Sequence, residues 1–85
     1  MRYTYDDEAD ALYVSLIEGA DVARSVVVDE GRSVDLGADG SAVGIEVLGA
    51  SAGVAVLDLV NRFDLGAHVA HLQALEGQRF APSRV

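Results

Sequence analysis

The chain has 85 residues, which is enough for one small domain and too few for a second hydrophobic core. Hydrophobic residues make up 51% of the chain and charged residues 24%, a composition too apolar for a disordered protein. The sequence contains no cysteine, so disulfides, thiolate metal sites and a cysteine nucleophile are excluded. Its 14 acidic and 6 basic residues give a net charge of −8. This excess argues against a surface that binds nucleic acid or anionic membranes, because both require clustered Lys and Arg.

The acidic excess lies in the first half of the chain. Residues 1–48 hold eleven acidic and three basic side chains, whereas residues 49–85 hold three of each. A charge asymmetry of this kind points to a partner of opposite sign. The sequence has neither an apolar run of about 18 residues nor a basic-then-apolar leader. We therefore expect a soluble, cytoplasmic protein with no membrane contact.

Short β-prone runs separated by turn residues fill the chain up to Leu48, a pattern typical of an antiparallel β-meander. The runs cover residues 2–5, 11–18, 22–29, 32–36 and 42–48. Turn residues at positions 30–31 and 37–40 predict tight hairpins between the last three runs. The run over residues 11–18 is apolar on both faces, so we expect this strand to be central or covered on two sides.

Gly44 interrupts the last of these strands. A glycine inside a strand contributes no side chain to the packing, and it marks a bulge or a place where another group lies close against the backbone. We therefore expect one of these two features at Gly44.

After Leu48 the apolar residues stop alternating. Residues 54–60 fit either a short helix, with Asp58 near its first turn, or an added strand. The sequence leaves these two alternatives open.

The segment that follows has the period of an amphipathic helix. Its apolar residues recur at helical spacing and are Leu65, Val69, Leu72 and Leu75. Asp64 is placed to cap the start of this helix, and Gly77 is placed to end it. The sequence thus predicts one α+β domain, with a β-meander of four to five strands over residues 1–48. Residues 49–85 form its extension and tail, with one or two C-terminal helices.

Four carboxylates lie within five residues, in the segment Asp6-Asp7-Glu8-Ala9-Asp10. Such a cluster could ligate a hard cation through its oxygens or take part in acid–base chemistry. The alternate spacing of Asp6, Glu8 and Asp10 matches only the first part of a calcium loop, which also needs a glycine and a distal bidentate Glu. A solvated turn, where Asp and Glu are favoured, is the simpler interpretation.

The other candidate residues have no recognised catalytic spacing. His68 and His71 occupy neighbouring positions on one helix face, but a catalytic zinc needs three protein ligands. The serines lack a nucleophile elbow, and the glycines lack a phosphate-binding arrangement. The tyrosines have no interleaved Lys or Arg and fit sheet packing. The sequence therefore predicts no catalytic residue, no metal site and no cofactor.

Two segments resemble one known family. The first runs from Tyr3 to Leu16 as YTYDDEADALYVSL, and the second runs from Val43 to Leu48 as VGIEVL. Together they resemble the YuzE-like family of small bacterial proteins, a domain of unknown function numbered 2283. The resemblance implies a small antiparallel sheet followed by a helix, with no established activity. Some members are encoded beside small ribonuclease-like toxins, which implies an antitoxin-like role for those members.

We interpret the chain as a non-enzymatic binding module that caps a basic partner in an antitoxin-like manner. The predicted binding residues are an acidic set and an apolar helix stripe, namely Asp6, Glu8, Asp10, Leu65, Val69 and Leu72. Expected partners are a second copy, forming a homodimer, and a small basic protein. Two alternatives stay open: a small metal- or ligand-dependent enzyme using the carboxylates of residues 6–10, and a purely structural homodimer.

Overall fold

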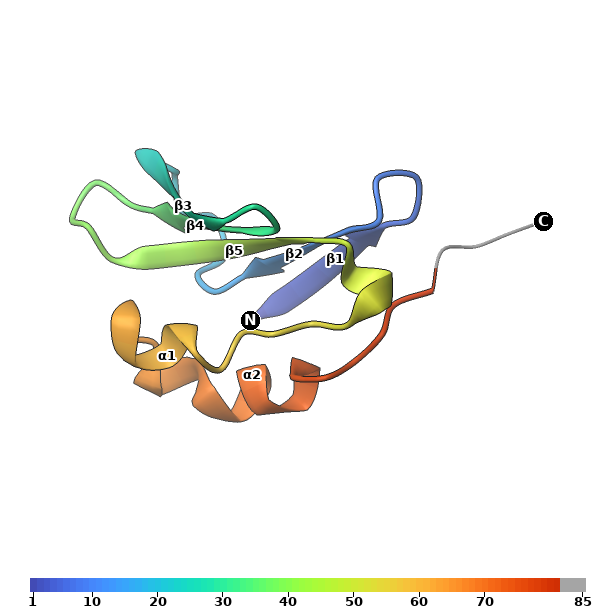
Figure 1. The fold of residues 1–85 in the computed structure, drawn as a ribbon. Coiled ribbons are helices and arrows are strands. Elements are labelled where there is room, and N and C mark those ends of the chain that lie inside the picture. Colours follow the sequence, from blue (N-terminus) through green and yellow to red (C-terminus); the bar gives the residue numbers. More distant parts are fainter. Residues whose placement is uncertain (82–85) are drawn as a thin grey trace.

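The structure, a computed structural model, describes residues 1–81. Its strands are β1 (Arg2–Asp6), β2 (Ala11–Ser15), β3 (Arg24–Asp29), β4 (Arg32–Leu36) and β5 (Ala42–Leu48). The elements after β5 are the 3-10 turns η1 (Ala50–Ala52) and η2 (Gly66–His68) and the helices α1 (Leu59–Arg62) and α2 (Val69–Leu75). Figure 1 shows α1 and α2 in a layer on one side of the sheet. The α+β class predicted from the sequence is confirmed.

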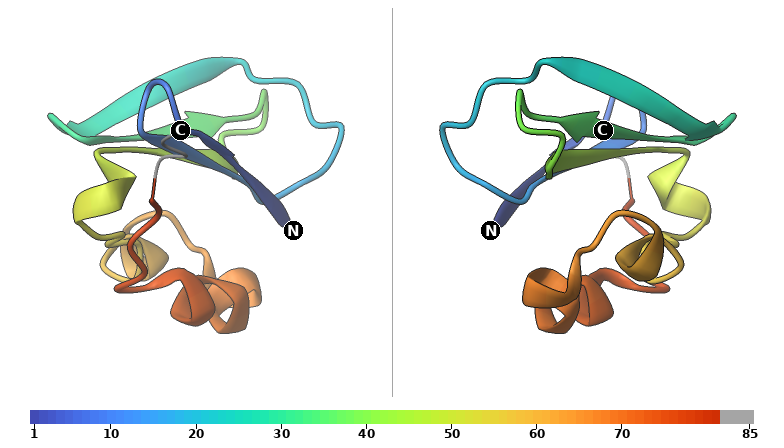
Figure 2. Two further views of the ribbon diagram at one scale, coloured as in Figure 1. Left: turned by 90° about the vertical axis from the view of Figure 1, so that its right-hand side faces the viewer. Right: turned by 90° about the vertical axis from the view of Figure 1, so that its left-hand side faces the viewer.

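All five strands belong to one antiparallel sheet with the order β1-β2-β5-β4-β3. This order differs from that of a simple meander, because β5 lies between β2 and β4. The chain reaches β3 through residues 16–23, which swing wide of the sheet in Figure 2. The Leu16 amide donates to the Val43 carbonyl at 2.9 Å and the Ala23 amide to the Leu36 carbonyl at 2.8 Å, so this connection passes the ends of β5 and β4. The central position suits β5, since five of its seven residues are buried.

The hydrophobic core lies between the sheet and the helical layer. Its largest buried side chains are Leu12, Val14, Val34, Ile45, Val56, Leu59, Leu65 and Leu72. The first four come from strands and the last four from the segment after residue 53. Each layer thus buries the apolar side of the other.

Residues 54–56, which fitted either a helix or a strand, belong to neither a helix nor a strand. They are held by contacts to the end of α2. The Gly77 amide donates to the Val54 carbonyl at 2.8 Å. The Glu76 carboxylate accepts hydrogen bonds from the amides of Val56 and Leu57, at 2.8 and 2.9 Å. Helix α1 then begins at Leu59, directly after Asp58 as expected for the helical alternative.

Asp64 does not cap the following helix, contrary to the prediction. It adopts a left-handed conformation with φ 56°, and the segment opens with η2, whose N-cap is Leu65 without a side-chain hydrogen bond. Leu65 is only 2% exposed and belongs to the core. The predicted end of the helix is confirmed, because α2 stops at Leu75 and Gly77 follows with φ 79°.

Candidate functional site

The face of the sheet turned away from the helices carries a polar network. The hydroxyl of Tyr13 on β2 donates to Oδ2 of Asp35 on β4 at 2.8 Å. The hydroxyl of Ser25 on β3 donates to Oδ1 of the same carboxylate at 2.5 Å. Asp35 therefore accepts one hydrogen bond from each side and is fixed in the plane of the sheet surface. We call this side of the sheet the open face.

Tyr13 reaches Asp35 by crossing Gly44 on the intervening strand β5. A Cβ atom on Gly44 would lie 1.9 Å from the Tyr13 hydroxyl oxygen and 2.5 Å from the ring carbon that bears it. Only a residue without a side chain leaves room for the ring. The close approach expected at Gly44 is confirmed, and Tyr13 is the group that makes it.

Burial of the Tyr13 side chain, followed by its hydrogen bond to Asp35, raises the pKa of Tyr13 to about 12. The negative charges of Asp35 and Glu46 contribute to the same rise. Near neutral pH Tyr13 is therefore protonated and acts as a hydrogen-bond donor, not as a base. The network presents a positioned carboxylate on the open face.

The acidic turn between β1 and β2 divides into exposed and structural residues. Oδ1 of Asp6 accepts hydrogen bonds from the amides of Glu8 and Ala9, at 3.0 and 3.3 Å, and both Asp6 and Glu8 are exposed. Oδ1 of Asp10 accepts from the Tyr5 hydroxyl at 2.6 Å. The same carboxylate accepts from the amide and hydroxyl of Ser51, at 2.9 and 2.5 Å. Asp10 thus joins the turn to η1.

The structure does not bring the acidic turn and the histidines together. His71 lines a cavity beside Met1 and Tyr3, at the opposite end of β1 from the turn. His68 lines another cavity, beside the β4–β5 loop. Within residues 1–81, no group of three or more His, Asp or Glu side chains is arranged to hold a metal ion.

The predicted helix stripe faces the sheet. Leu65 and Leu72 are 2% and 0% exposed and belong to the core, whereas Val69 is 37% exposed. Of these three predicted binding residues, Val69 therefore offers a surface in the folded chain. Throughout residues 1–81, the helices fall short of the length and apolar character needed to cross a membrane.

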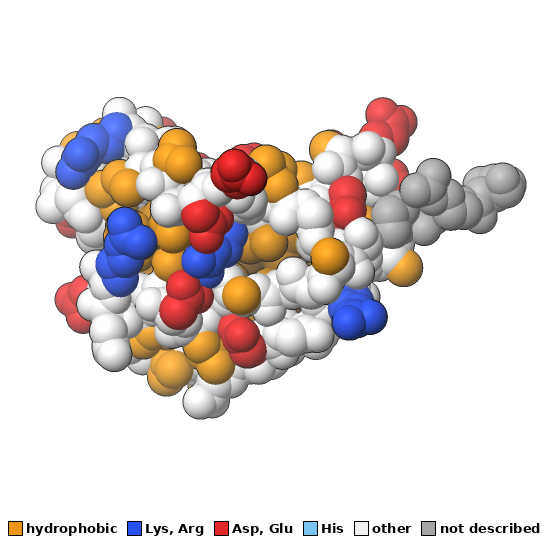
Figure 3. Space-filling model, in the orientation of Figure 1, with side chains coloured by type: hydrophobic (Ala, Val, Ile, Leu, Met, Phe, Trp, Pro, Cys, Tyr) orange, Lys and Arg blue, Asp and Glu red, His pale blue; other side chains and the backbone are white. Residues whose placement is uncertain are grey.

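Arg32, which the sequence pattern does not single out, links the two layers. Its guanidinium donates to Asp29 at 2.8 and 3.1 Å, to Asp58 at 2.6 Å and to the Ala55 carbonyl at 2.9 Å. The hydrogen bonds from Arg32 lower the pKa of Asp29 and of Asp58. Figure 3 shows acidic side chains around basic ones where the sheet meets the helical layer. The sequence offers one signal for this cluster, the spacing of Asp29 and Arg32 across a tight turn.

One family model matches the part of the chain that contains the polar network, the acidic turn and all five strands. The model of the family described as "Protein of unknown function (DUF2283)" matches residues 2–51. The chain belongs to this family. The DUF2283 region includes Tyr13, Asp35 and Gly44, whereas α1 and α2 follow it. The resemblance found in the two sequence motifs is thereby confirmed.

No match to the chain was found among curated proteins, and none among solved structures.

Proposed function

We propose that the protein is a non-enzymatic binding module whose open face docks on a basic partner protein. The open face is the observation that carries this proposal. It presents the carboxylates of Asp35 and Glu46 together with two exposed apolar side chains, Val27 at 74% and Leu48 at 47% exposure. Apolar area combined with oriented charge is what a specific protein interface needs.

The electrostatics of the open face favour a cationic partner. Tyr13 and Ser25 each use one oxygen of Asp35, and a carboxylate has about four acceptor sites. Asp35 can therefore accept further hydrogen bonds from an Arg or Lys without losing its present ones. Because the hydroxyl donors already fix the carboxylate, little side-chain ordering accompanies binding.

The rest of the sheet region adds to the negative electrostatic potential around the open face. Residues 1–48 carry the whole net charge of −8, and the exposed Asp6 and Glu8 extend the negative surface beyond β1 and β2. Such a field accelerates the encounter with a basic protein. RNA-cleaving enzymes are one class of partner with the right chemistry, because they hold a polyanion on Lys and Arg. An acidic face competes for that surface, which is the antitoxin-like role.

A charge-reversal pull-down from the native cell tests the proposal. We expect the wild-type protein to co-elute with a small basic protein at a fixed ratio. Glu46→Lys should weaken this association at least about tenfold, because the new ammonium group would face the positive charges of the partner and repel them. Glu18→Lys is the matched control, since Glu18 is exposed in the β2–β3 connection and outside the open face.

Two results would contradict the proposal. One is recovery of the protein with no basic partner. The other is a partner that is retained equally by the wild type and by Glu46→Lys. Raising the ionic strength during elution gives an independent check, because screening should release a partner held by surface charge.

A further inference from the structure

The strand β1 forms an edge of the sheet and has a regular register. In the sheet of residues 1–81, β1 has one neighbour, β2, and pairs with it over five successive residues without a shift in register. The five residues Arg2–Asp6 are exposed or half-buried. Edge strands offer a row of backbone donors and acceptors to another chain, and proteins usually blunt them with Lys, Pro or a bulge. β1 has no Lys, Pro or bulge, and its two charged residues, Arg2 and Asp6, stand at its ends.

The sequence of β1 is complementary to itself in the antiparallel direction. When two copies align with Thr4 on the two-fold axis, Tyr3 faces Tyr5 of the second copy. In the same register Arg2 faces Asp6 of the second copy. Each pair lies on one face of the sheet, because residues two apart share a face. The register therefore creates two ion pairs and two aromatic pairs at once, each of a kind that stabilises antiparallel strands.

Neighbouring registers lack this complementarity. If Tyr3 were on the axis, Arg2 would face Thr4 and no ion pair would form. If Tyr5 were on the axis, Tyr3 would face Asp7, and a single aromatic pair, between the two copies of Tyr5, would remain. The alignment on Thr4 is therefore favoured over its neighbours by side-chain chemistry.

The other edge strand, β3, is less suited to pairing with a copy of itself. With Val27 on the axis, Arg24 would face Glu30 of the second copy. However, β3 has a register shift between Val27 and Asp29, and a bulge at an edge interrupts further pairing. Asp29 also already accepts hydrogen bonds from Arg32.

The charged ends of β1 can exchange their present contacts for new ones. Both turn hydrogen bonds of Asp6 go to Oδ1, so they do not use Oδ2. Arg2 lies 3.8 Å from Glu18, and the two side chains are 69% and 62% exposed. An exposed pair of this kind contributes little stability, so replacing it by a pair with Asp6 of a second copy costs little.

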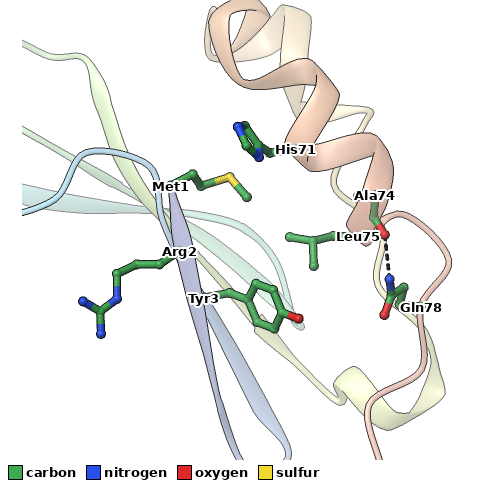
Figure 4. A pocket seen from close by; sticks show the side chains of 7 residues that line it. All are labelled: Met1, Arg2, Tyr3, His71, Ala74, Leu75 and Gln78. Carbon is green, nitrogen blue, oxygen red and sulfur yellow. Dashed lines mark hydrogen bonds between the residues drawn. The ribbon is translucent and has the colours of Figure 1, made fainter.

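A cavity beside β1 fits the same arrangement. It has a volume of about 370 Å³ and lies between β1 and α2, with Met1, Tyr3, His71 and Leu75 in its lining. Figure 4 shows Met1 and Tyr3 extending from the start of β1 toward α2, while Arg2 points away from the cavity. Tyr3 is 49% exposed. A ring from the second copy, placed opposite Tyr3, would cover part of that exposed surface.

We propose that the protein forms a homodimer in which β1 pairs antiparallel with β1 of a second copy, with Thr4 on the two-fold axis. The two five-stranded sheets then form one continuous sheet. An axis perpendicular to the sheet places both helical layers on one side and both open faces on the other. This dimer forms whether or not the open face binds a basic protein.

Site-specific cross-linking tests the register. The chain has no cysteine, so an introduced cysteine is the only thiol. Opposite residues in an antiparallel pair have Cα atoms about 4.5 to 5.5 Å apart, within the span of a disulfide. Thr4→Cys should therefore give a covalent dimer under mild oxidation. The matched control Val27→Cys, on the exposed side of β3, should stay monomeric on a non-reducing gel. The reverse pattern, or no cross-link with Thr4→Cys, would overturn the proposal.

Sedimentation equilibrium tests the ion pairs. The wild type should sediment as a dimer, and Arg2→Asp should raise the dimer dissociation constant at least about tenfold, because two carboxylates then face each other. Arg24→Asp changes the net charge equally at the β3 edge and should leave the constant unchanged. Mixing Arg2→Asp with Asp6→Arg should restore a dimer, since both ion pairs reform between the two variants. A monomeric wild type, or equal weakening by both Arg variants, would overturn the proposal.

Discussion

Gly44 and Tyr13 depend on each other in the packing of the sheet. Glycine weakens a strand because it packs no side chain, yet here its absence of a Cβ lets the Tyr13 ring cross β5 and donate to Asp35. The ring covers the gap that the glycine leaves. The Tyr13 ring of β2 thus supplies the packing that Gly44 does not give to β5.

Gly44→Ala should lower the free energy of unfolding by about 1 to 3 kcal/mol, because Tyr13 must swing away and lose its hydrogen bond to Asp35. Urea denaturation of both proteins measures this difference. The control is the same substitution in a Tyr13→Ala background, where the ring is gone and the added methyl group meets no obstacle. An equal loss in both backgrounds would show that Gly44 acts through its backbone conformation and not through Tyr13.

The sequence predicts that something lies against Gly44 but does not identify what. A glycine inside a strand is a local signal, and it is visible from the pattern alone. The identity of the contacting group depends on which strands flank β5, and a simple meander would not place β2 there. The role of Asp35 could not be predicted for the same reason. Its hydrogen bond to Tyr13 joins residues on two strands that are not neighbours in the sheet.

Arg32 connects two elements, the β3–β4 hairpin and the start of α1. The side chain is 16% exposed, and it holds Asp29 on one side and Asp58 on the other. The Asp58 pKa is lower in the folded protein than its usual value because Arg32 donates to it. Because the unfolded chain binds this proton more tightly, the stabilisation is present above about pH 4 and is lost as the pH falls through the folded-state pKa.

Asp58→Asn should therefore destabilise the protein at about pH 7 and destabilise it less at about pH 3, because protonation of the carboxyl weakens the ion pair with Arg32. Asp58 is 57% exposed, so solvent screening limits the loss to about 1 kcal/mol or less. Thermal unfolding of the variant and the wild type at both pH values measures it. Asp7→Asn removes an exposed carboxylate of the β1–β2 turn and serves as the control for the change in net charge. A loss that is the same at both pH values would contradict the ion-pair explanation.

The elements of the C-terminal part were predictable to different degrees. The spacing of Leu65, Val69, Leu72 and Leu75 repeats at the helical period and predicts an apolar stripe that ends before Gly77. Leu65, Leu72 and Leu75 lie in the core, whereas Val69 is 37% exposed. Residues 54–56 follow neither period, because contacts from Glu76 about 20 positions away hold them in place. No local pattern encodes a contact of that separation.

At the scale of the whole molecule, the family boundary and the hydrophobic core do not coincide. The DUF2283 match ends at residue 51, but half of the largest core side chains come from residues after 53. The sheet alone would expose the apolar side chains of β2, β4 and β5 to water. The chain is therefore expected to fold as one unit in which the C-terminal extension completes the core.

A chain truncated to residues 1–53 should fail to fold. It lacks six buried side chains, namely Val54, Val56, Leu59, Leu65, Leu72 and Leu75. Burial of that many Val and Leu side chains contributes roughly 10 kcal/mol or more, which is comparable with the entire stability of a small domain. Circular dichroism and the dispersion of amide resonances measure folding. Adding residues 54–81 as a separate peptide should restore both signals, because the peptide supplies the missing layer. Cooperative thermal unfolding of residues 1–53 without the peptide would show instead that the sheet is a domain by itself.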